Sequence, residues 1–480
     1  MATESDTVAV AASDEDRELG TKPVHGLFVK YSLITLIGMA AQAVMVILEG
    51  VIIGNGLGSF GLAVVGIIMP LELLNLALGG SLGMGVATVA GNRLGAGDAA
   101  GARKAFSQGF WLSTYLILAI SVLIFIFAPQ IALMLGATPD LVDGVVTFMR
   151  IFVCFYPFCI LGQMMGSVLR VDEKPGLSTA AMCGSAALAV VWLYCSIYLA
   201  GMGIAGAAVY YGISIGLWFV VIFYFIFSKN TQFKISLSDM KVEGKLCREI
   251  LTIGLPTFLV QVASLVYTIV INNYLGVLGG DLEISAFAIL NGYLVYILNM
   301  MWLCATYGVQ PLASYNHGAQ RPDRLKTLIR ASLVDTAGAI AVISALSTVC
   351  AAPICTIFCG DEPDLIALAA ANTLPLCVLA CLGTVSNVMS AYFQAIDKVV
   401  IATVLGMSRY LVFTVPCIMI MSSFMGINGV WWAQPVADVL CFAFTMVFVV
   451  RELRRLSALH VERASETSPA SELSQEGAVA

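Results

Sequence analysis

The sequence predicts an all-α integral membrane protein with twelve transmembrane helices, arranged as two pseudo-symmetric six-helix bundles (a parallel repeat) around a central cavity. Three observations predict this fold: the composition, the spacing of the apolar segments and an internal repeat. Of the 480 residues, 59% are hydrophobic and only 11% are charged, and the mean hydropathy is +0.93. A soluble fold could not bury so much apolar surface, because a sizeable part of every soluble domain faces water. The composition therefore excludes the water-soluble enzyme classes.

The two ends of the chain differ from the rest. Acidic residues crowd the first eighteen positions, and more acidic residues follow in a Ser/Ala-rich tail. We predict that residues 1–24 form a disordered acidic N-terminal arm and that residues 456–480 form a disordered C-terminal tail. Because an acidic N-terminus lacks the basic segment of a signal peptide, the first membrane helix is expected to stay in the mature protein. Nothing in this charge pattern indicates a nucleic-acid partner.

Between these ends, twelve apolar segments are long enough to cross a bilayer, which takes about 20 residues. They are separated by Gly-rich, Pro-containing or charged breaks, such as Gly95-Ala96-Gly97-Asp98 and Lys174-Pro175-Gly176. The predicted spans lie near 31–53, 61–90, 106–128, 145–169, 178–199, 205–228, 249–275, 284–313, 331–352, 365–395, 400–423 and 428–450.

The distribution of Lys and Arg orients these spans. Every second loop is basic and the intervening loops carry no Lys or Arg; the basic loops lie near 91–105, 170–177, 229–248, 314–330 and 396–399. Basic loops stay on the cytoplasmic side of a membrane. The pattern predicts a multi-pass protein of the plasma (inner) membrane with both termini in the cytoplasm.

Metal, cofactor and nucleotide sites are not expected. Most of the thirteen cysteines lie inside apolar segments without a CxxC pair, and there are only three histidines. The Gly-rich loop that begins at Gly95 lacks the Lys and Ser/Thr of a phosphate-binding loop. If the protein moves a solute across the membrane, we therefore expect an ion gradient rather than ATP to supply the energy.

The chain also contains an internal duplication. Gly85 matches Gly308, Gly95-Ala96 matches Gly318-Ala319, and Gly203-Ile204 matches Gly426-Ile427, all at an offset of 223 residues. Each half holds six spans, which defines an N-lobe (25–228), a cytoplasmic linker (229–248) and a C-lobe (249–455). Because six is even, both halves enter the membrane in the same direction, as in transporters with parallel repeats. Rocking of the lobes would give alternating access; a symmetric structural or channel-like bundle is the alternative.

An ordered set of short motifs across residues 25–455 resembles the multidrug and toxic compound extrusion (MATE) family, in its DinF-like bacterial branch. The motifs are Gln42 followed by Glu49, Gly54-Asn55-Gly56-Leu57-Gly58, Gly83-Met84-Gly85, Leu169-Arg170, Gly254-Leu255-Pro256, Gln310-Pro311-Leu312, Arg409-Tyr410 and Gln434-Pro435. The resemblance implies a secondary active transporter, not an enzyme. We expect the protein to act as a monomer. It also implies export of bulky amphiphilic or cationic small molecules, coupled to inward movement of H⁺ or Na⁺.

Glu49 is the strongest candidate for the ion-coupling residue. It lies in the apolar stretch between Ala43 and Ile53, and an ionisable side chain inside a membrane usually has a function. The resemblance places the family's first-helix coupling acid at this position, usually as Asp. Gln42 lies two helical turns earlier and would share its face. The alternative is that Glu49 simply reaches the outer membrane interface. For Glu72, in the second span, we expect a place at the membrane edge.

Other polar and aromatic residues in the spans are candidates for a substrate cavity, although helix–helix packing is the alternative for each of them. These candidates are Gln163, Gln261, Tyr267, Asn272, Asn291, Tyr293, Trp302 and Asn387. Arg409 lies deep in the eleventh span and needs a partner there, for which Asp438 is the candidate.

Two other functions remain possible at this point. A flippase for lipid-linked precursors would share the twin-bundle architecture, but it should carry several cationic side chains in its cavity, and this chain offers few. An integral membrane enzyme acting on prenyl diphosphates would need clusters of Asp that hold Mg²⁺ in cytoplasmic loops, and no such cluster occurs in the sequence.

Overall fold

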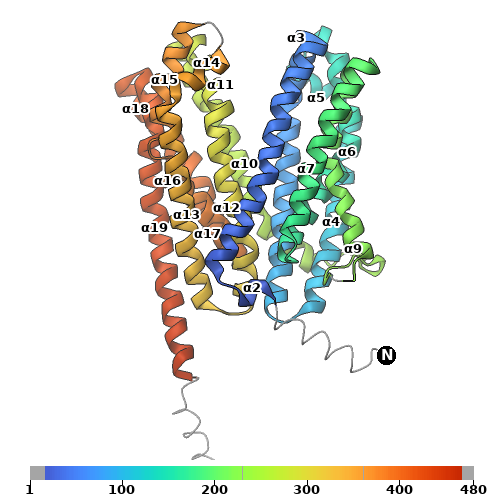
Figure 1. Cartoon of the computed structure of the whole chain (residues 1–480), viewed down its shortest axis with the longest axis vertical. Helices are drawn as coiled ribbons and strands as arrows, with labels where there is room; N and C mark the ends of the chain where they lie inside the picture. The colour runs from blue at the N-terminus through green and yellow to red at the C-terminus, as the bar shows by residue number, and fades with distance from the viewer. Residues whose placement is uncertain (1–16, 230, 360–361, 467–480) are drawn as a thin grey trace, which may run out of the picture. The chain divides into compact units, whose positions relative to one another are not determined.

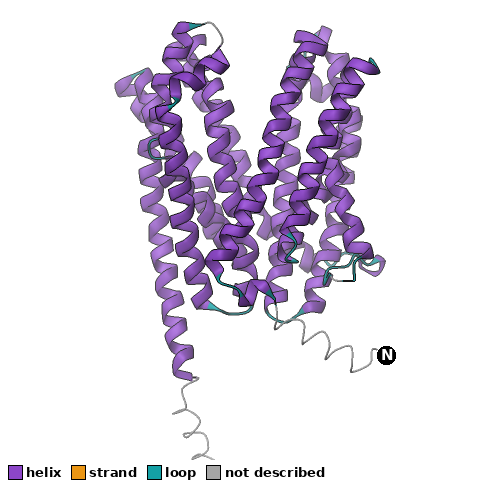
Figure 2. Cartoon of the chain, in the orientation of Figure 1, coloured by secondary structure: helices purple, strands orange, loops and turns teal. Residues whose placement is uncertain are grey.

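The computed structural model describes residues 17–229, 231–359 and 362–466. Figure 2 shows that this part of the chain is built from helices and connecting loops, without a strand. Of the ends that are predicted to be disordered, residues 1–16 and 467–480 lie outside the described residues. The prediction is wrong for residues 456–466, because they continue the last helix, which ends at Glu466. The all-helical membrane fold that the composition predicts is confirmed.

The described residues account for twelve spans. Ten helices are long and apolar enough to cross a membrane, and α15 (Pro363–Cys377) with α16 (Ala380–Ala395) makes one further span that is bent by 52°. Helix α3 (Val24–Gly95) counts once among the ten, but its 72 residues would extend about 108 Å, more than three times the thickness of a bilayer core. Two helices meet within α3 at Gly58, where φ is 63° and ψ is −155°. Dividing α3 there gives twelve.

Gly58 corrects the predicted position of the first break. The sequence places it at Gly54-Asn55-Gly56, whereas these residues remain helical and the backbone changes direction at Gly58. The positive φ of Gly58 belongs to a region that residues with a side chain rarely adopt. The break therefore lies at the one glycine of this motif that takes up a non-helical conformation.

The chain divides into two compact units. The first, which we call the N-terminal unit, is Val29–Gln261; the second, the C-terminal unit, combines Met1–Phe28 with Val262–Ala480. Both boundaries fall inside continuous helices, one in α3 and the other in α10 (Gly244–Gly279). Each unit is described separately below.

The N-terminal unit is organised around α6. This helix packs against α4, α7 and α8 (Figure 1), and both parts of α3 contribute to the same core, with Met45 and Ile53 from the first part and Ile68 and Leu71 from the second. The remaining elements of the unit are α4 (Ala99–Ile126), α5 (Ala128–Met134), α6 (Pro139–Val171), α7 (Pro175–Tyr194), the π-helical η1 (Cys195–Leu199), α8 (Gly203–Gly216), η2 (Leu217–Val221), α9 (Ile222–Phe227) and η3 (Leu237–Met240).

Helix α16 occupies the corresponding central place in the C-terminal unit, where it packs against α12, α13, α17 and α19 (Figure 1). The other elements are α2 (Glu18–Thr21), α11 (Asp281–Leu290), the π-helical η4 (Asn291–Val295), α12 (Tyr296–Gly318), α13 (Pro322–Val349), α14 (Ala351–Cys359), α17 (Val399–Met407), the π-helical η5 (Ser408–Thr414), α18 (Val415–Met425) and α19 (Ile427–Glu466).

Local sequence explains where several helices begin. Pro139, Pro175 and Pro322 stand at the first turns of α6, α7 and α13, where a missing N–H costs nothing because the first N–H groups of a helix have no partner inside it. At α4, the side chain of Asp98 accepts a hydrogen bond of 2.7 Å from the backbone N–H of Gly101, which is a normal N-cap.

The short helix α2 is held against the C-terminal unit, although the sequence analysis includes its residues in the N-terminal arm. Leu19 is fully buried, and its carbonyl oxygen accepts hydrogen bonds from Asn316 Nδ2 at 3.1 Å and Arg324 Nη2 at 2.9 Å. Arg324 Nη2 also donates to the carbonyl of Lys22 at 2.7 Å, and Arg321 donates to that of Gly20. Cations at the C-terminal end of a helix interact favourably with its free carbonyl groups.

Candidate functional sites in the two units

Glu49, the candidate coupling residue, lies in the first part of α3 with only 7% of its surface exposed. Two phenols of α8 contact its carboxyl group. Tyr210 Oη donates a hydrogen bond to Glu49 Oε2 at 3.0 Å, and Tyr211 Oη donates to Glu49 Oε1. Both oxygens of a membrane-embedded carboxyl group are therefore hydrogen-bonded, as buried polar groups normally are.

Aromatic packing fixes the position of these phenols. The ring of Tyr211 lies edge-on to the rings of Phe148 and Phe152 of α6, at centroid distances of 5.4 and 5.7 Å, and it meets Tyr210 at 5.3 Å. Edge-to-face pairs of this kind are favourable beyond the area they bury. Neither tyrosine is among the site residues predicted from the sequence; the available signal is two adjacent phenols in a largely apolar helix.

Glu72 belongs to the same unit as the Glu49 site. It stands in the second part of α3, where it is half-buried and interacts electrostatically with Glu49 and Tyr211. The backbone beside it is held in place, since the carbonyl of Leu71 accepts a hydrogen bond from Tyr156 of α6. Both parts of α3 pack against the same core, which brings residues from two spans together. A place for Glu72 at the membrane edge stays a prediction.

Gln42 is also in the N-terminal unit and is half-buried. Its Nε2 atom contacts the backbone carbonyls of Ser214 at 3.4 Å and Met182 at 3.5 Å. These long contacts direct the amide nitrogen toward α7 and α8 rather than toward Glu49. A role for Gln42 in ion coupling stays a prediction.

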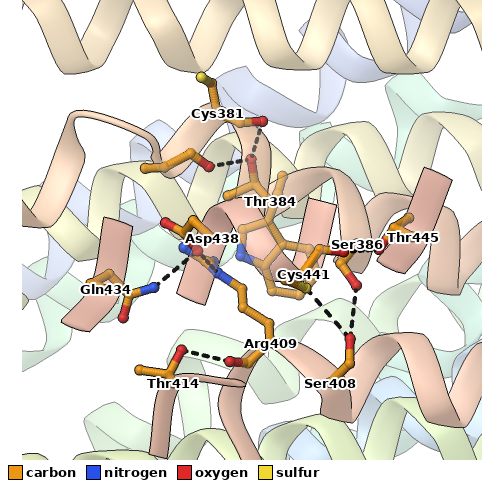
Figure 3. A network of polar contacts seen from close by, with 12 residues as sticks. Cys381, Thr384, Ser386, Ser408, Arg409, Thr414, Gln434, Asp438, Cys441 and Thr445 are labelled. Carbon is orange, nitrogen blue, oxygen red and sulfur yellow. Dashed lines mark hydrogen bonds and ion pairs between the residues drawn. The ribbon is translucent and has the colours of Figure 1, made fainter. Parts of the chain in front are cut away.

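The C-terminal unit holds a buried ion pair (Figure 3). Arg409 Nε donates to Asp438 Oδ1 at 3.0 Å, and Gln434 Nε2 donates to the same oxygen, also at 3.0 Å. Asp438 is completely buried and Arg409 is 8% exposed. Gly383 lets the pair fit, because a Cβ atom there would lie 1.8 Å from Asp438 Oδ1. The two charged residues that the sequence analysis pairs are thus in direct contact.

The helix that carries Arg409 is irregular. Arg409 lies in η5, a π-helical turn, and its carbonyl accepts a hydrogen bond from Thr414 Oγ1 at 2.6 Å. Ser386 and Ser408 extend the polar network, since both hydroxyl groups donate to the carbonyl of Leu405 at 2.7 Å. Single π-helical turns are frequent at functional sites, and a buried ion pair of this kind is costly unless its geometry is good.

The eight residues predicted to line a substrate cavity are divided between the two units. Gln163 and Gln261 belong to the N-terminal unit, and the other six belong to the C-terminal unit. Of these eight, Tyr267 lies beside the ion pair, since its ring lies 5.8 Å from that of Tyr410, the sequence neighbour of Arg409.

The remaining candidates have local surroundings of their own. Tyr293 Oη lies 3.3 Å from Cys355 Sγ, and Trp302 Nε1 donates to Asn299 Oδ1 at 2.9 Å. Gln261, Asn272 and Asn291 are half-buried. Asn387 is 3% exposed, and neither amide atom has a partner among the described residues. A common substrate cavity for these residues stays a prediction.

Comparisons with known proteins show which family this chain resembles. The model of the MatE family matches residues 35–195 and again 256–420. The two segments begin 221 residues apart and end 225 apart, which agrees with the offset of 223 found in the sequence and confirms the duplication.

Curated relatives and solved structures agree with this match. The chain is 26% identical to "Multidrug export protein MepA" of Staphylococcus haemolyticus (strain JCSC1435), over 91% of this chain and 94% of that protein. It is 24% identical to the protein of the same name from Staphylococcus aureus (strain MSSA476), over 89% and 94%.

Two solved structures have the same fold. One is an outward-facing multidrug resistance MATE family transporter of the MOP superfamily, and the other is a MOP superfamily transporter from Pyrococcus furiosus. Each has a TM-score of 0.85 and 22% identity, over 92% of this chain and 98% of that chain. Because the family model matches most of the sequence, in both halves, the chain belongs to the MatE (MATE) family of membrane transporters.

Proposed function

We propose that this protein exports bulky amphiphilic or cationic compounds across the plasma membrane, and that inward movement of H⁺ drives the export. Membership of the MatE family supports a transporter, and the relatives described above are named multidrug export proteins. In this proposal the lobes 25–228 and 249–455 alternate in access to the two sides of the membrane, and the chain acts as a monomer. The basic loops keep both termini in the cytoplasm.

The buried carboxyl group of Glu49 is the observation that carries the choice of H⁺. Both of its oxygens accept hydrogen bonds from phenols, which stabilise the charged form, whereas the surrounding apolar core favours the protonated form. A carboxyl group balanced between these two influences can bind and release a proton during a transport cycle. Coupling to Na⁺ is the alternative outcome of the test below.

The side chains available in the C-terminal unit support an aromatic, cationic substrate. Tyr267 and Tyr410 lie next to each other, and tyrosine rings attract organic cations. The chain also contains 20 methionines, whose flexible side chains adapt to ligands of different shape.

The lipid-precursor flippase is less well supported. A diphosphate head group needs unpaired cationic side chains, but the charge of Arg409 is balanced by Asp438. Arg409 would therefore have to break a buried ion pair, at a cost of about 3–5 kcal/mol, before it could bind such a group.

Transport by the purified protein in liposomes, with imposed H⁺ or Na⁺ gradients, tests the proposal. Uptake of ethidium should follow a H⁺ gradient and should be absent with a Na⁺ gradient alone. Glu49→Gln should abolish H⁺-driven uptake without loss of the folded protein. Uptake that follows only Na⁺, or a Glu49→Gln variant that transports normally, would contradict the proposal.

A further inference from the structure

A line of polar residues continues from the Glu49 site along the second part of α3. Glu72, Asn75 and Gly79 are spaced by three and four residues, which puts them on one face of a helix. This face packs against α6, because a Cβ atom at Gly79 would lie 2.7 Å from the Gln163 side chain and because Tyr156 donates to the carbonyl of Leu71.

Several polar groups along this face are unpartnered. Asn75 is completely buried, yet neither its Nδ2 nor its Oδ1 has a hydrogen-bond partner among the described residues, and the same holds for Nε2 of Gln163, which is 8% exposed. No hydrogen bond or ion pair of the Glu72 carboxyl group is found in the described part of the chain either. Buried polar groups are nearly always satisfied by protein or by ordered water. These groups therefore indicate a place where water binds.

The line is connected to Glu49 through α8 and α6. Tyr211 donates to Glu49 and interacts electrostatically with Glu72. Its ring also contacts Phe152, which in turn contacts Tyr156 at 5.2 Å beside Leu71. Glu49 and Glu72 thus interact with the same phenol, that of Tyr211, which a fixed aromatic cluster holds in place.

Only weak acids face Glu72 in the described residues. Glu49 belongs to the first part of α3, and the other titratable side chains that interact with Glu72 are Tyr156 and Cys159 of α6 and Tyr210 and Tyr211 of α8. Two carboxyl groups without a cation between them cannot both be charged at low cost. They are suited to sharing one proton.

The line of polar residues runs toward the Gly95 end of α3. Glu72 lies 14 residues beyond Gly58, or about 21 Å along the helix, and Asn75 and Gly79 lie further toward the Gly95 end of α3. A proton that moves from Glu49 to Glu72 and then along these amides would therefore travel toward Gly95, which the basic loop 91–105 assigns to the cytoplasmic side. The whole path lies within one unit.

We propose that Glu72 is a second proton-carrying residue of the N-terminal unit, which receives the proton of Glu49 and passes it to water held by Asn75 and Gln163. This inference rests on the proposed function. In the first step the O–H bond at Glu49 breaks as an O–H bond forms at Glu72, so that one negative charge moves from Glu72 to Glu49. In the second step a water molecule accepts the proton from Glu72. The two amides orient the water and carry no proton themselves.

Two transport modes of the purified full-length protein in liposomes separate this role from a structural one. Exchange of ethidium for ethidium requires no net proton movement, whereas uptake driven by a H⁺ gradient does. In Glu72→Gln we expect exchange at the wild-type rate and H⁺-driven uptake reduced by about a hundredfold, the low end of what positioned proton-transfer groups contribute. Glu72→Asp, which keeps a carboxyl group, should restore part of the driven uptake.

Two further variants keep the test decisive. Asn75→Leu replaces an unpartnered amide with an apolar side chain of similar size, and it should reproduce the selective loss even if Glu72→Gln does not fold. Asp143→Asn removes an exposed acidic residue near the start of α6 and should leave both transport modes unchanged.

The possible failures can be told apart. If Glu72→Gln and Asn75→Leu keep wild-type H⁺-driven uptake, or lose exchange and uptake together while folded, Glu72 is not a proton carrier and the inference is overturned. If the wild-type protein itself shows no H⁺-driven uptake, the proposed function has failed, and the inference fails with it.

Discussion

Tyr210 Oη lies 3.0 Å from Glu49 Oε2, and its neighbour Tyr211 donates to the second oxygen of the same carboxyl group. The two phenols come from one turn of α8, and the carboxyl group comes from a helix 161 residues earlier in the chain. This contact gives the N-terminal unit a carboxyl group whose charge is supported by hydrogen bonds but opposed by burial.

The first prediction concerns these phenols. Tyr210→Phe should shift the pH dependence of H⁺-driven ethidium uptake toward higher pH, because loss of a donor to the carboxylate favours its protonated form. A lost hydrogen bond to a charged group is worth about 1.5–3 kcal/mol, which corresponds to a shift of about one to two pH units. Uptake measured across a series of pH values checks this. Tyr194→Phe, on an exposed tyrosine of α7, is the control.

Parts of this fold could be predicted from the sequence because they depend on local chemistry. The start of α7 at Pro175 follows from the break at Lys174-Pro175, and the twelve spans follow from the lengths of apolar segments. The burial of Glu49 follows from its apolar neighbours. The contact between Arg409 and Asp438 follows from the cost of an unpaired charge inside a membrane.

Other parts depend on contacts between distant segments, which spacing alone does not reveal. Tyr210 and Tyr211 could not be assigned to Glu49 without knowing that α8 packs beside α3. From the sequence alone, Glu72 is expected at the membrane edge. Only the fold shows that both parts of α3 pack against the same core, where Glu72 interacts with Glu49. The predicted position of the first break is wrong because each of Gly54, Gly56 and Gly58 could provide a turn. Of these three, only Gly58 adopts a positive φ.

The second prediction concerns the ion pair of the C-terminal unit. Arg409→Met should lower the free energy of unfolding by about 3–5 kcal/mol, because it leaves Asp438 buried without its cation. The double variant Arg409→Met with Asp438→Asn should be more stable than Arg409→Met alone. Thermal unfolding of the purified proteins in detergent measures both changes. Equal stability of the single and double variants would show that the pair does not act as a unit.

A third prediction addresses the glycine that accommodates this pair. Gly383→Ala should destabilise the protein by about 1–3 kcal/mol, the usual cost of overpacking, because the added Cβ atom would lie 1.8 Å from Asp438 Oδ1 and 2.8 Å from Arg409 Nε. Gly338→Ala in α13 is the matched control, since no atom lies within 4 Å of its added Cβ. The melting temperature should fall in the first variant only.

The last prediction concerns the attachment of α2. Arg324 Nη2 donates to two carbonyl groups, those of Leu19 and Lys22, at 2.9 and 2.7 Å. Arg324→Ala removes both bonds, while Asn316 and Arg321 still donate to α2. Hydrogen bonds to charged groups contribute about 1.5–3 kcal/mol each, so α2 should detach in a measurable fraction of molecules.

Limited trypsin digestion of the purified protein reports this detachment, because Arg17 directly precedes α2. The other flanking cation, Lys22, is followed by Pro23 and is not a trypsin site. Cleavage after Arg17 should be faster in Arg324→Ala than in the wild type by at least a factor of about ten, because 1.4 kcal/mol already changes an opening equilibrium tenfold. Arg330→Ala removes an exposed arginine from the same helix and should leave the rate unchanged. Equally fast cleavage in the wild type and both variants would contradict this prediction. It would mean that apolar contacts of the buried Leu19, rather than Arg324, supply most of the free energy that holds α2.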